Sequence, residues 1–152
     1  MTSSPRTISC LAIFAAFAFL SSSMMFAQVP PVQAPRTVDK GEQSNIDAPK
    51  QVVVRSQSEW TTLWQQHSPD RKRPEVDFSK EMVVGVFSGS RPTAGYNVSI
   101  VSTVAKDGTV LVQYRESQPQ RGALTAQVLT FPYHLVTVPK AAGEVKFEKV
   151  GQ

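Results

Sequence analysis

The sequence predicts an α+β domain in which one N-terminal helix packs on a mostly antiparallel sheet or β-roll of about six strands. Three observations predict this fold. A single stretch has the apolar spacing of a helix, about six short stretches have strand-like patterns, and the strand connections are too short to hold crossover helices. The chain has 152 residues, which suits one domain with an appendage and is too short for two full domains.

The first predicted strand is followed directly by the predicted helix. A β-branched run indicates a strand at residues 51–55. Ser56 or Ser58 can then cap a helix, which Pro69 ends because a proline disfavours the helical conformation of the residue before it. The buried face of this helix is expected to carry Trp60, Leu63, Trp64 and His67. We therefore expect both tryptophans to pack on the sheet.

Five further stretches have strand-like patterns. They are residues 82–87, 96–104, 110–115, 127–138 and 144–150. In the second stretch one face is expected to hold Tyr96, Val98, Ile100, Ser102 and Val104. A hairpin turn is predicted at Lys106-Asp107-Gly108, and Pro132 predicts an edge position or a bulge, because proline cannot donate to a ladder. We expect a core containing Trp60, Leu63, Trp64, Phe87, Ile100, Tyr133 and Phe147.

The N-terminal segment has the layout of a secretory signal peptide. An apolar run at residues 8–20 follows Arg6 and is broken by serines before it reaches the roughly 20 residues that a membrane-spanning helix needs. We predict a signal peptide over residues 1–27, and a protein that is exported and either periplasmic or secreted. After cleavage no integral membrane domain is expected; an uncleaved anchor is the alternative.

Residues 28–50 predict a flexible, disordered, proline-rich linker. The segment contains Pro30, Pro31, Pro35 and Pro49 and shows no apolar periodicity, so it lacks the apolar content that folding requires. The folded domain is accordingly expected to span residues 51–150.

Composition and motifs exclude several kinds of chemistry. The only cysteine, Cys10, lies inside the predicted signal peptide, which argues against disulfides, thiol nucleophiles and thiolate zinc sites. The net charge of +4 is small and most basic residues are scattered, so nucleic-acid binding is not indicated. The sequence lacks a nucleophile elbow and a nucleotide loop, and His67 and His134 are not spaced as metal ligands. We expect a protein that is not an enzyme and holds no metal and no cofactor.

The best candidate for binding is the loop at residues 89–96, which joins two predicted strands. Pro92 stiffens its backbone, Gly95 can adopt a positive φ, and Tyr96 offers a large amphipathic surface with few torsions to freeze. A rigid loop of this kind loses little entropy on docking. The candidate partner-binding residues are Arg91, Pro92, Thr93, Gly95 and Tyr96. An ordinary strand connection with an inward-packed tyrosine is the alternative.

These motifs resemble the C-terminal domain of the protease complex subunit PrcB. The resemblance covers most of residues 51–150 and is carried by the Trp-x-x-x-Trp helix with Leu63, Val76-Asp77-Phe78, the run at 82–87, the 91–96 loop and residues 131–140. It implies an exported bacterial module without catalytic residues or cofactors, resembling an accessory subunit of a secreted protease complex. Ala94 departs from the two glycines that commonly precede the tyrosine in the family, which matters if that position needs a positive φ.

Two other functions remain open. The 91–96 loop is also similar to the Asn-Pro-Thr-Thr-Gly-aromatic loop of chagasin-type cysteine protease inhibitors, with Arg91 in place of the asparagine. The glycine-rich loop and the Arg-Pro-aromatic loop of those inhibitors are not evident in this sequence. A carbohydrate or small-ligand binding module that uses Trp60 or Tyr96 is a weaker alternative, because the tryptophans are better explained as core.

Overall fold

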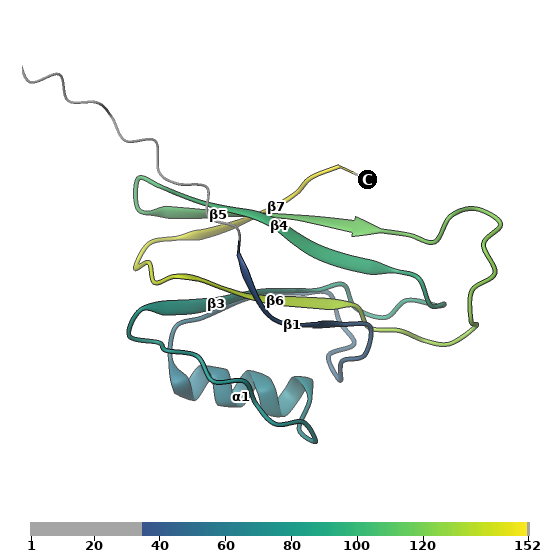
Figure 1. The fold of residues 1–152 in the computed structure, drawn as a ribbon, viewed down its shortest axis with the longest axis horizontal. Helices are drawn as coiled ribbons and strands as arrows, with labels where there is room; N and C mark the ends of the chain where they lie inside the picture. The colour runs from purple at the N-terminus through teal and green to yellow at the C-terminus, as the bar shows by residue number, and fades with distance from the viewer. Residues whose placement is uncertain (1–34, 152) are drawn as a thin grey trace, which may run out of the picture.

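The computed structural model describes residues 35–151, and this part of the chain is mostly β structure with one short helix (Figure 1). This agrees with the predicted α+β class. The elements are β1 (Arg36–Gly41), β2 (Lys50–Val54), α1 (Gln57–His67), β3 (Glu81–Phe87), β4 (Asn97–Lys106), β5 (Thr109–Ser117), β6 (Tyr133–Pro139) and β7 (Val145–Lys149). No helix within residues 35–151 is long and apolar enough to cross a membrane. The predicted signal peptide, residues 1–27, lies outside the described residues.

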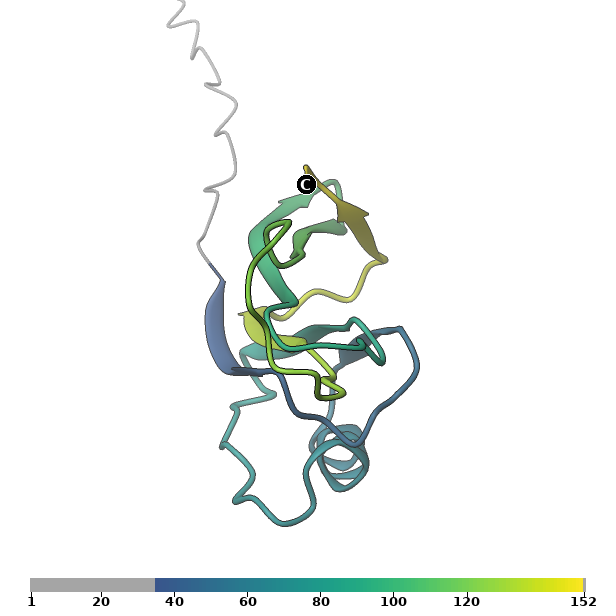
Figure 2. The ribbon, with the colours of Figure 1, turned by 90° about the vertical axis from the view of Figure 1, so that its right-hand side faces the viewer.

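The strands form two sheets that face each other, and α1 lies on the outer face of one of them (Figures 1 and 2). The four-stranded sheet has the order β1-β6-β3-β2 and is antiparallel throughout. The three-stranded sheet has the order β4-β5-β7, in which β5 and β7 are parallel. The molecule therefore has three layers: the helix, the larger sheet and the smaller sheet.

Two apolar cores fill the spaces between these three layers. On the helix side, α1 packs against β2, β3 and β6 through a buried set that includes Trp60, Leu63, Trp64, Phe87 and Tyr133. Between the sheets, a second buried set includes Ile100, and Phe147 packs against it while remaining partly exposed. Each residue that the sequence assigned to the core thus lies in or against one of the two cores.

Capping and side-chain hydrogen bonds fix the helix and the loop that follows it. The Ser56 hydroxyl accepts a hydrogen bond from the backbone N–H of Glu59 at 3.3 Å, and the Glu59 carboxylate accepts one from the N–H of Arg55 at 2.7 Å. The indole of Trp60 donates to the carbonyl of Pro74 at 2.9 Å. The indole of Trp64 likewise donates to a carbonyl of this loop, so the two tryptophans anchor the loop as well as the helix.

The prediction of a disordered linker over residues 28–50 is wrong where the structure describes that segment. Residues 36–41 form β1, which pairs with β6 at the edge of the four-stranded sheet, and the folded part therefore begins before residue 51. Val38 is the only apolar side chain of β1, so the strand has almost no local signal. It is formed by pairing with a strand almost 100 residues later, which an apolar pattern cannot reveal. With β1 the described part of the chain has seven strands.

A bulge overturns the predicted alternation in β4. Ile100 pairs with Tyr114 and Ser102 pairs with Gln113, so Val101 is an extra residue in the ladder. The side chains after it change face: Val101 is exposed and Thr103 is buried. The hairpin turn predicted after this strand is confirmed, since Asp107 and Gly108 both have a positive φ.

The predicted long strand at residues 127–138 is shorter in the structure. Strand β6 begins at Tyr133, after Pro132, and residues 127–129 belong to no strand. Thr130 makes an isolated antiparallel bridge with Arg91. Proline ends the ladder here rather than interrupting it, because it has no N–H to donate.

Candidate functional site

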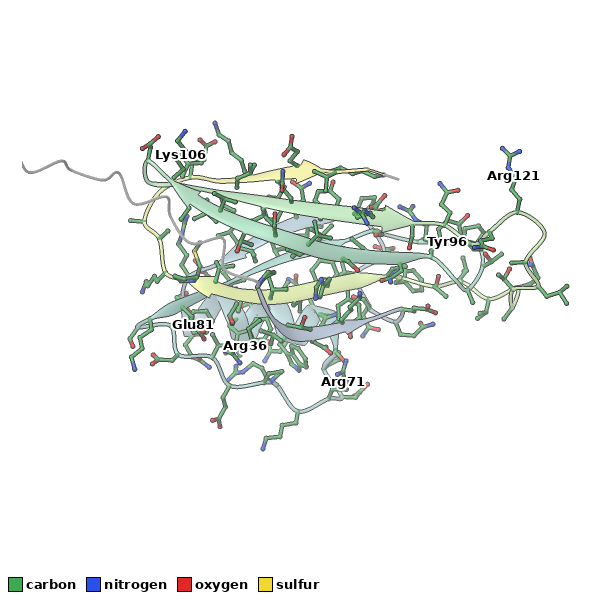
Figure 3. All side chains as sticks on the ribbon, turned by 45° about the horizontal axis from the view of Figure 1, so that its top comes forward. Arg36, Arg71, Glu81, Tyr96, Lys106 and Arg121 are labelled. Carbon is green, nitrogen blue, oxygen red and sulfur yellow. The ribbon has the colours of Figure 1, made fainter. Side chains whose placement is uncertain are left out.

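A cleft of about 640 Å³ opens where the β3–β4 loop meets the ends of β5 and β7. Figure 3 shows Tyr96 at this end of the molecule. The residues around the cleft include Ser88, Arg91, Pro92, Tyr96, Glu116 and Lys149. Three of the five predicted partner-binding residues therefore line the cleft, whereas Thr93 and Gly95 do not.

Hydrogen bonds to residues 126–130 hold the 89–96 loop in place. The backbones of Arg91 and Thr130 exchange two hydrogen bonds, of 2.8 and 2.9 Å. The N–H of Ala94 donates to the carbonyl of Ala126 at 3.0 Å, and the Thr130 hydroxyl donates to the carbonyl of Thr93 at 3.0 Å. The loop is thus one side of a short paired structure, and the other side lies more than 30 residues away in the sequence.

Near the end of this loop, beside Tyr96, Gly95 requires the left-handed conformation. Gly95 has a φ of 90°, which an L side chain rarely adopts, and a Cβ atom built there would approach Pro119 to 3.1 Å. Ala94 is not among the described residues with a positive φ. An alanine at that position is therefore compatible with the loop.

Charged groups gather around one carboxylate in the cleft. Glu116 accepts hydrogen bonds from Lys149 at 2.8 Å and from the Ser88 hydroxyl at 3.2 Å, and the Arg91 guanidinium lies 3.7 Å away. Burial raises the pKa of Glu116, but the hydrogen bonds and the two cations outweigh it and lower that pKa below its usual value. The cleft therefore holds a fixed negative charge between two positive ones.

Tyr96 forms an aromatic wall of the cleft beside these charges. It is partly exposed, it belongs to neither apolar core, and the Arg91 guanidinium lies over its ring, 5.9 Å from the centroid. The structure thus places this tyrosine at the surface and not in the core, with a cation held against its face.

Comparison with known families identifies this part of the chain. Residues 82–139 match the family model described as PrcB C-terminal. This segment is therefore similar to the PrcB C-terminal family. The segment runs from β3 to the last residue of β6 and contains the whole 89–96 loop. No curated protein and no solved structure matches the chain.

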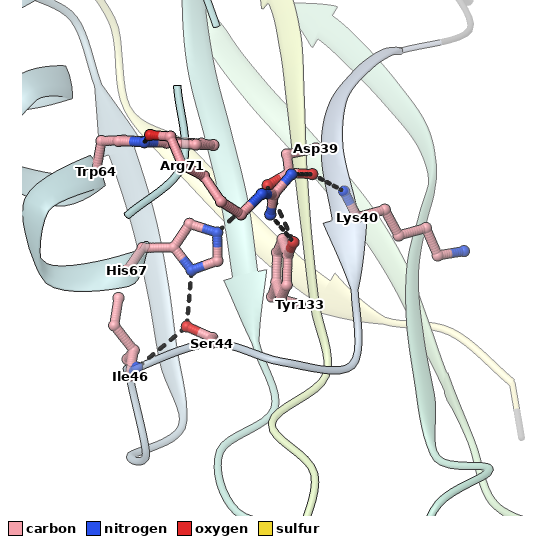
Figure 4. A network of polar contacts seen from close by, with 8 residues as sticks. All are labelled: Asp39, Lys40, Ser44, Ile46, Trp64, His67, Arg71 and Tyr133. Carbon is pink, nitrogen blue, oxygen red and sulfur yellow. Dashed lines mark hydrogen bonds and ion pairs between the residues drawn. The ribbon is translucent and has the colours of Figure 1, made fainter. Parts of the chain in front are cut away.

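A second polar cluster joins the PrcB C-terminal segment to the residues before it (Figure 4). Asp39 on β1 accepts two hydrogen bonds from the Arg71 guanidinium, at 2.9 and 3.0 Å, and one from the hydroxyl of Tyr133 at 3.0 Å. Its carboxylate also lies 3.4 Å from Nε2 of His67. On the other side of the ring, Nδ1 of His67 is 2.8 Å from the Ser44 hydroxyl. We name these five residues the Asp39 network.

The Asp39 network contains a serine, a histidine and an aspartate in contact, the same residue types as the catalytic triad of a serine hydrolase. Its surroundings, however, are those of a structural cluster. His67 is fully buried, and burial lowers its pKa although the contact with Asp39 opposes this. The hydroxyl of Ser44 also accepts a hydrogen bond from the N–H of Ile46. A nucleophile must reach its substrate, and Ser44 is itself buried. No sequence pattern indicates this cluster, because Asp39 and Ser44 lie in the segment predicted as linker.

His134, the second histidine, is occupied at the seam between the sheets. Its Nδ1 accepts a hydrogen bond from the backbone N–H of Ile100 on β4 at 2.8 Å, and its Nε2 lies 2.9 Å from the hydroxyl of Thr37 on β1. Burial and the nearby charge of Lys40 lower the pKa of His134 to about 4. Both ring nitrogens therefore serve the fold, and neither described histidine lines the cleft.

Proposed function

We propose that the chain is an exported, non-catalytic accessory subunit of a protease complex, and that it binds its protein partner through the cleft beside the 89–96 loop. The observation that carries the proposal is the family match over residues 82–139, which includes this loop and most of the cleft. Within the cleft, Arg91 and Tyr96 form a partly exposed pair on a loop that the chain holds in a defined geometry. Arginine and tyrosine side chains on a preorganised loop are enriched among the residues that dominate binding energy.

The placement of the titratable side chains supports a non-catalytic role. The cleft contains one carboxylate between two cations, and Glu116 is held ionised by them, so it is poorly suited to general acid or base work near neutral pH. The two histidines are buried and hydrogen bonded elsewhere. The groups that face the cleft can form hydrogen bonds and ion pairs with a partner, and the Ser88 hydroxyl there donates to a carboxylate whose lowered pKa makes it a weak base.

Replacement of Tyr96 by alanine is expected to weaken partner binding by more than about 2 kcal/mol, with little change in the thermal midpoint. The ring contributes to neither core, so its loss removes binding surface and no folding contact of note. The partner is first captured from the exported fraction of the native host with the tagged full-length chain and identified by mass spectrometry. Its affinity and the thermal midpoint are then measured on the same variants.

Two controls accompany this variant. Tyr96→Phe keeps the ring and should bind nearly as the unaltered chain does, and Val101→Ala removes an exposed apolar side chain on β4 away from the cleft. A large drop in midpoint for Tyr96→Ala without a specific loss of affinity would contradict the proposal. If the captured protein is a protease, assays with and without the chain decide between assistance and inhibition.

Export is proposed from the predicted signal peptide. The protein recovered from the native host is expected to begin at or near Gln28, because the small side chain of Ala27 suits the residue before the cleaved bond. N-terminal sequencing of the recovered protein tests this directly. An intact Met1 or Thr2 as the first residue would show that no signal peptide is removed.

A further inference from the structure

The 89–96 loop and residues 118–130 together form a projection from the end of the two sheets. Figure 3 shows Arg121 at the far end of this projection, beyond Tyr96. The two segments are joined by the backbone hydrogen bonds of Arg91 with Thr130 and of Ala94 with Ala126. We name this paired structure, residues 89–96 and 118–130, the finger.

The finger exposes apolar side chains that the described part of the chain does not cover. Leu124 is fully exposed, and Val128 and Leu129 are exposed by 48% and 57%. No charged residue occurs from Gly122 to Tyr133. Small soluble domains expose single apolar side chains routinely, but a run of neighbouring ones on a projecting segment marks a contact surface.

The backbone beside these side chains also lacks backbone hydrogen bonds within residues 35–151. Gln127, Val128 and Leu129 form no backbone hydrogen bond with any described residue, although Ala126 and Thr130 on either side of them do. Two residues after Leu129, the N–H of Phe131 donates to the carbonyl of Glu42. An uncharged segment whose N–H and C=O groups make no backbone hydrogen bond to the described residues can pair with another strand, and native proteins normally block such pairing with charge, proline or a bulge.

We propose that residues Gln127–Leu129 of the finger bind an extended, apolar segment of the partner polypeptide as an added strand, and that this segment carries acidic residues at one end. The proposal rests on the proposed function and specifies how the partner is held. The added strand satisfies the free backbone groups, and its apolar side chains cover Val128 and Leu129.

Charge supports an acidic partner segment and disfavours a second copy of this chain. The finger carries two arginines, Arg91 and Arg121, and no acidic residue. Glu116 already pairs with both Arg91 and Lys149 in the cleft, whereas the side chain of Arg121 is exposed at the tip. Two fingers paired with each other would bring like charges together, which is unfavourable.

The free backbone groups also favour a polypeptide over a membrane surface. The exposed Leu124 and the arginine at the tip resemble a lipid-contacting pair, but lipid tails offer no hydrogen-bond partner for the N–H and C=O groups of Gln127–Leu129. A strand satisfies those groups at the same time as it covers the apolar side chains. The polypeptide is therefore the occupant that accounts for both features.

The probe is a short synthetic peptide of alternating valine and threonine with a pair of aspartates at one end. In the purified protein it should slow amide hydrogen exchange at Gln127–Leu129 by about tenfold when most of the sites are filled. The same peptide with alternate backbone nitrogens methylated should have no effect, because it cannot complete the ladder. A version with lysines in place of the aspartates should bind the protein more weakly than the acidic peptide does. In the Arg121→Glu variant the lysine peptide should instead bind more tightly than the acidic one.

Variants at Leu129 separate the backbone contribution from that of the side chain. Leu129→Ala and Leu129→Pro both shorten the side chain, but only proline removes the N–H. We expect the proline variant to bind the peptide at least about tenfold more weakly than the alanine variant, with equal thermal midpoints, because this N–H makes no backbone hydrogen bond in the described structure.

Four results would overturn the inference. In two of them the acidic peptide fails to slow amide hydrogen exchange at Gln127–Leu129, or the methylated peptide slows it equally. In the third, exchange becomes slower as the protein concentration rises without any peptide, which would indicate pairing between copies of this chain. In the fourth, the protein binds anionic phosphatidylglycerol vesicles but not the peptide. The captured partner distinguishes this inference from the proposed function. If Tyr96→Ala loses affinity for the partner while Leu129→Pro and Leu129→Ala bind it equally, the added strand alone is overturned. If Tyr96→Ala keeps its affinity while Leu129→Pro binds more weakly than Leu129→Ala, binding through the cleft alone is overturned.

Discussion

Replacement of Trp64 by alanine is expected to lower the free energy of unfolding by about 3–5 kcal/mol. The side chain is only 4% exposed, and its ring lies 5.3 Å from the ring of Trp60 and 5.3 Å from that of His67. The indole N–H donates to the carbonyl of Arg71 at 2.8 Å. The variant therefore leaves a cavity in the helix-side core and releases the loop that supplies Arg71 to the Asp39 network.

A loss of this size is a large part of the stability of a small domain, which is typically about 5–15 kcal/mol. Urea unfolding followed by circular dichroism measures it. Gln65→Ala, on the exposed face of the same helix, is the control and should stay within about 0.5 kcal/mol of the unaltered chain. An unchanged midpoint for Trp64→Ala would mean that the ring does not stabilise the core as its burial indicates.

The parts of the fold that the sequence predicts well are those with local signals. The four-residue spacing of Trp60 and Trp64, the hydroxyl of Ser56 and the stop at Pro69 all lie within one short stretch, and α1 with its cap lies there. The apolar run of β3 and the Asp-Gly turn before β5 are of the same kind. Periodicity and turn chemistry act between neighbours, so a sequence displays them directly.

The parts that it does not predict depend on distant partners. Strand β1 has one apolar residue and is formed through pairing with β6, and the bulge at Val101 reflects how β4 fits over β5. The sequence indicated the 89–96 loop as a candidate site. It could not indicate that Glu116 and Lys149 lie opposite this loop, because those residues come from the ends of two other strands.

Replacement of Asp39 by asparagine is expected to destabilise the fold by about 2–3 kcal/mol, the upper part of the range for leaving a buried hydrogen-bonding group without its partner. The carboxylate is 10% exposed, whereas the Arg71 side chain is 53% exposed and can turn to water. Asparagine keeps the size but replaces one acceptor oxygen by an NH₂ group. That group would face the donors of Arg71, Tyr133 or His67, so at least one of these donors would lose its partner.

The ionisation of Asp39 gives the same network a dependence on pH. Burial raises the pKa of this carboxyl, but the hydrogen bonds from Arg71, Tyr133 and His67 outweigh it and lower the pKa below its usual 3.8. Because the folded-state pKa is lowered, the contribution of the carboxylate to stability is fully present above pH of about 4. It is lost as the pH falls through the lowered value. A titration of the Asp39 carboxyl carbon by NMR should therefore have its midpoint below 3.8.

An exposed carboxylate in the loop after α1 provides the matched control for Asp39→Asn. Asp70 is exposed, so Asp70→Asn removes the same charge without opening a buried network and should change the free energy of unfolding by less than about 0.5 kcal/mol. Hydrogen exchange should further show that Asp39→Asn releases β1 first, since the Asp39 network ties this edge strand to α1 and to the loop that carries Arg71. Equal stabilities of the two variants would contradict the structural role of the network, and would leave the pairing of β1 with β6 as what holds the first strand in place.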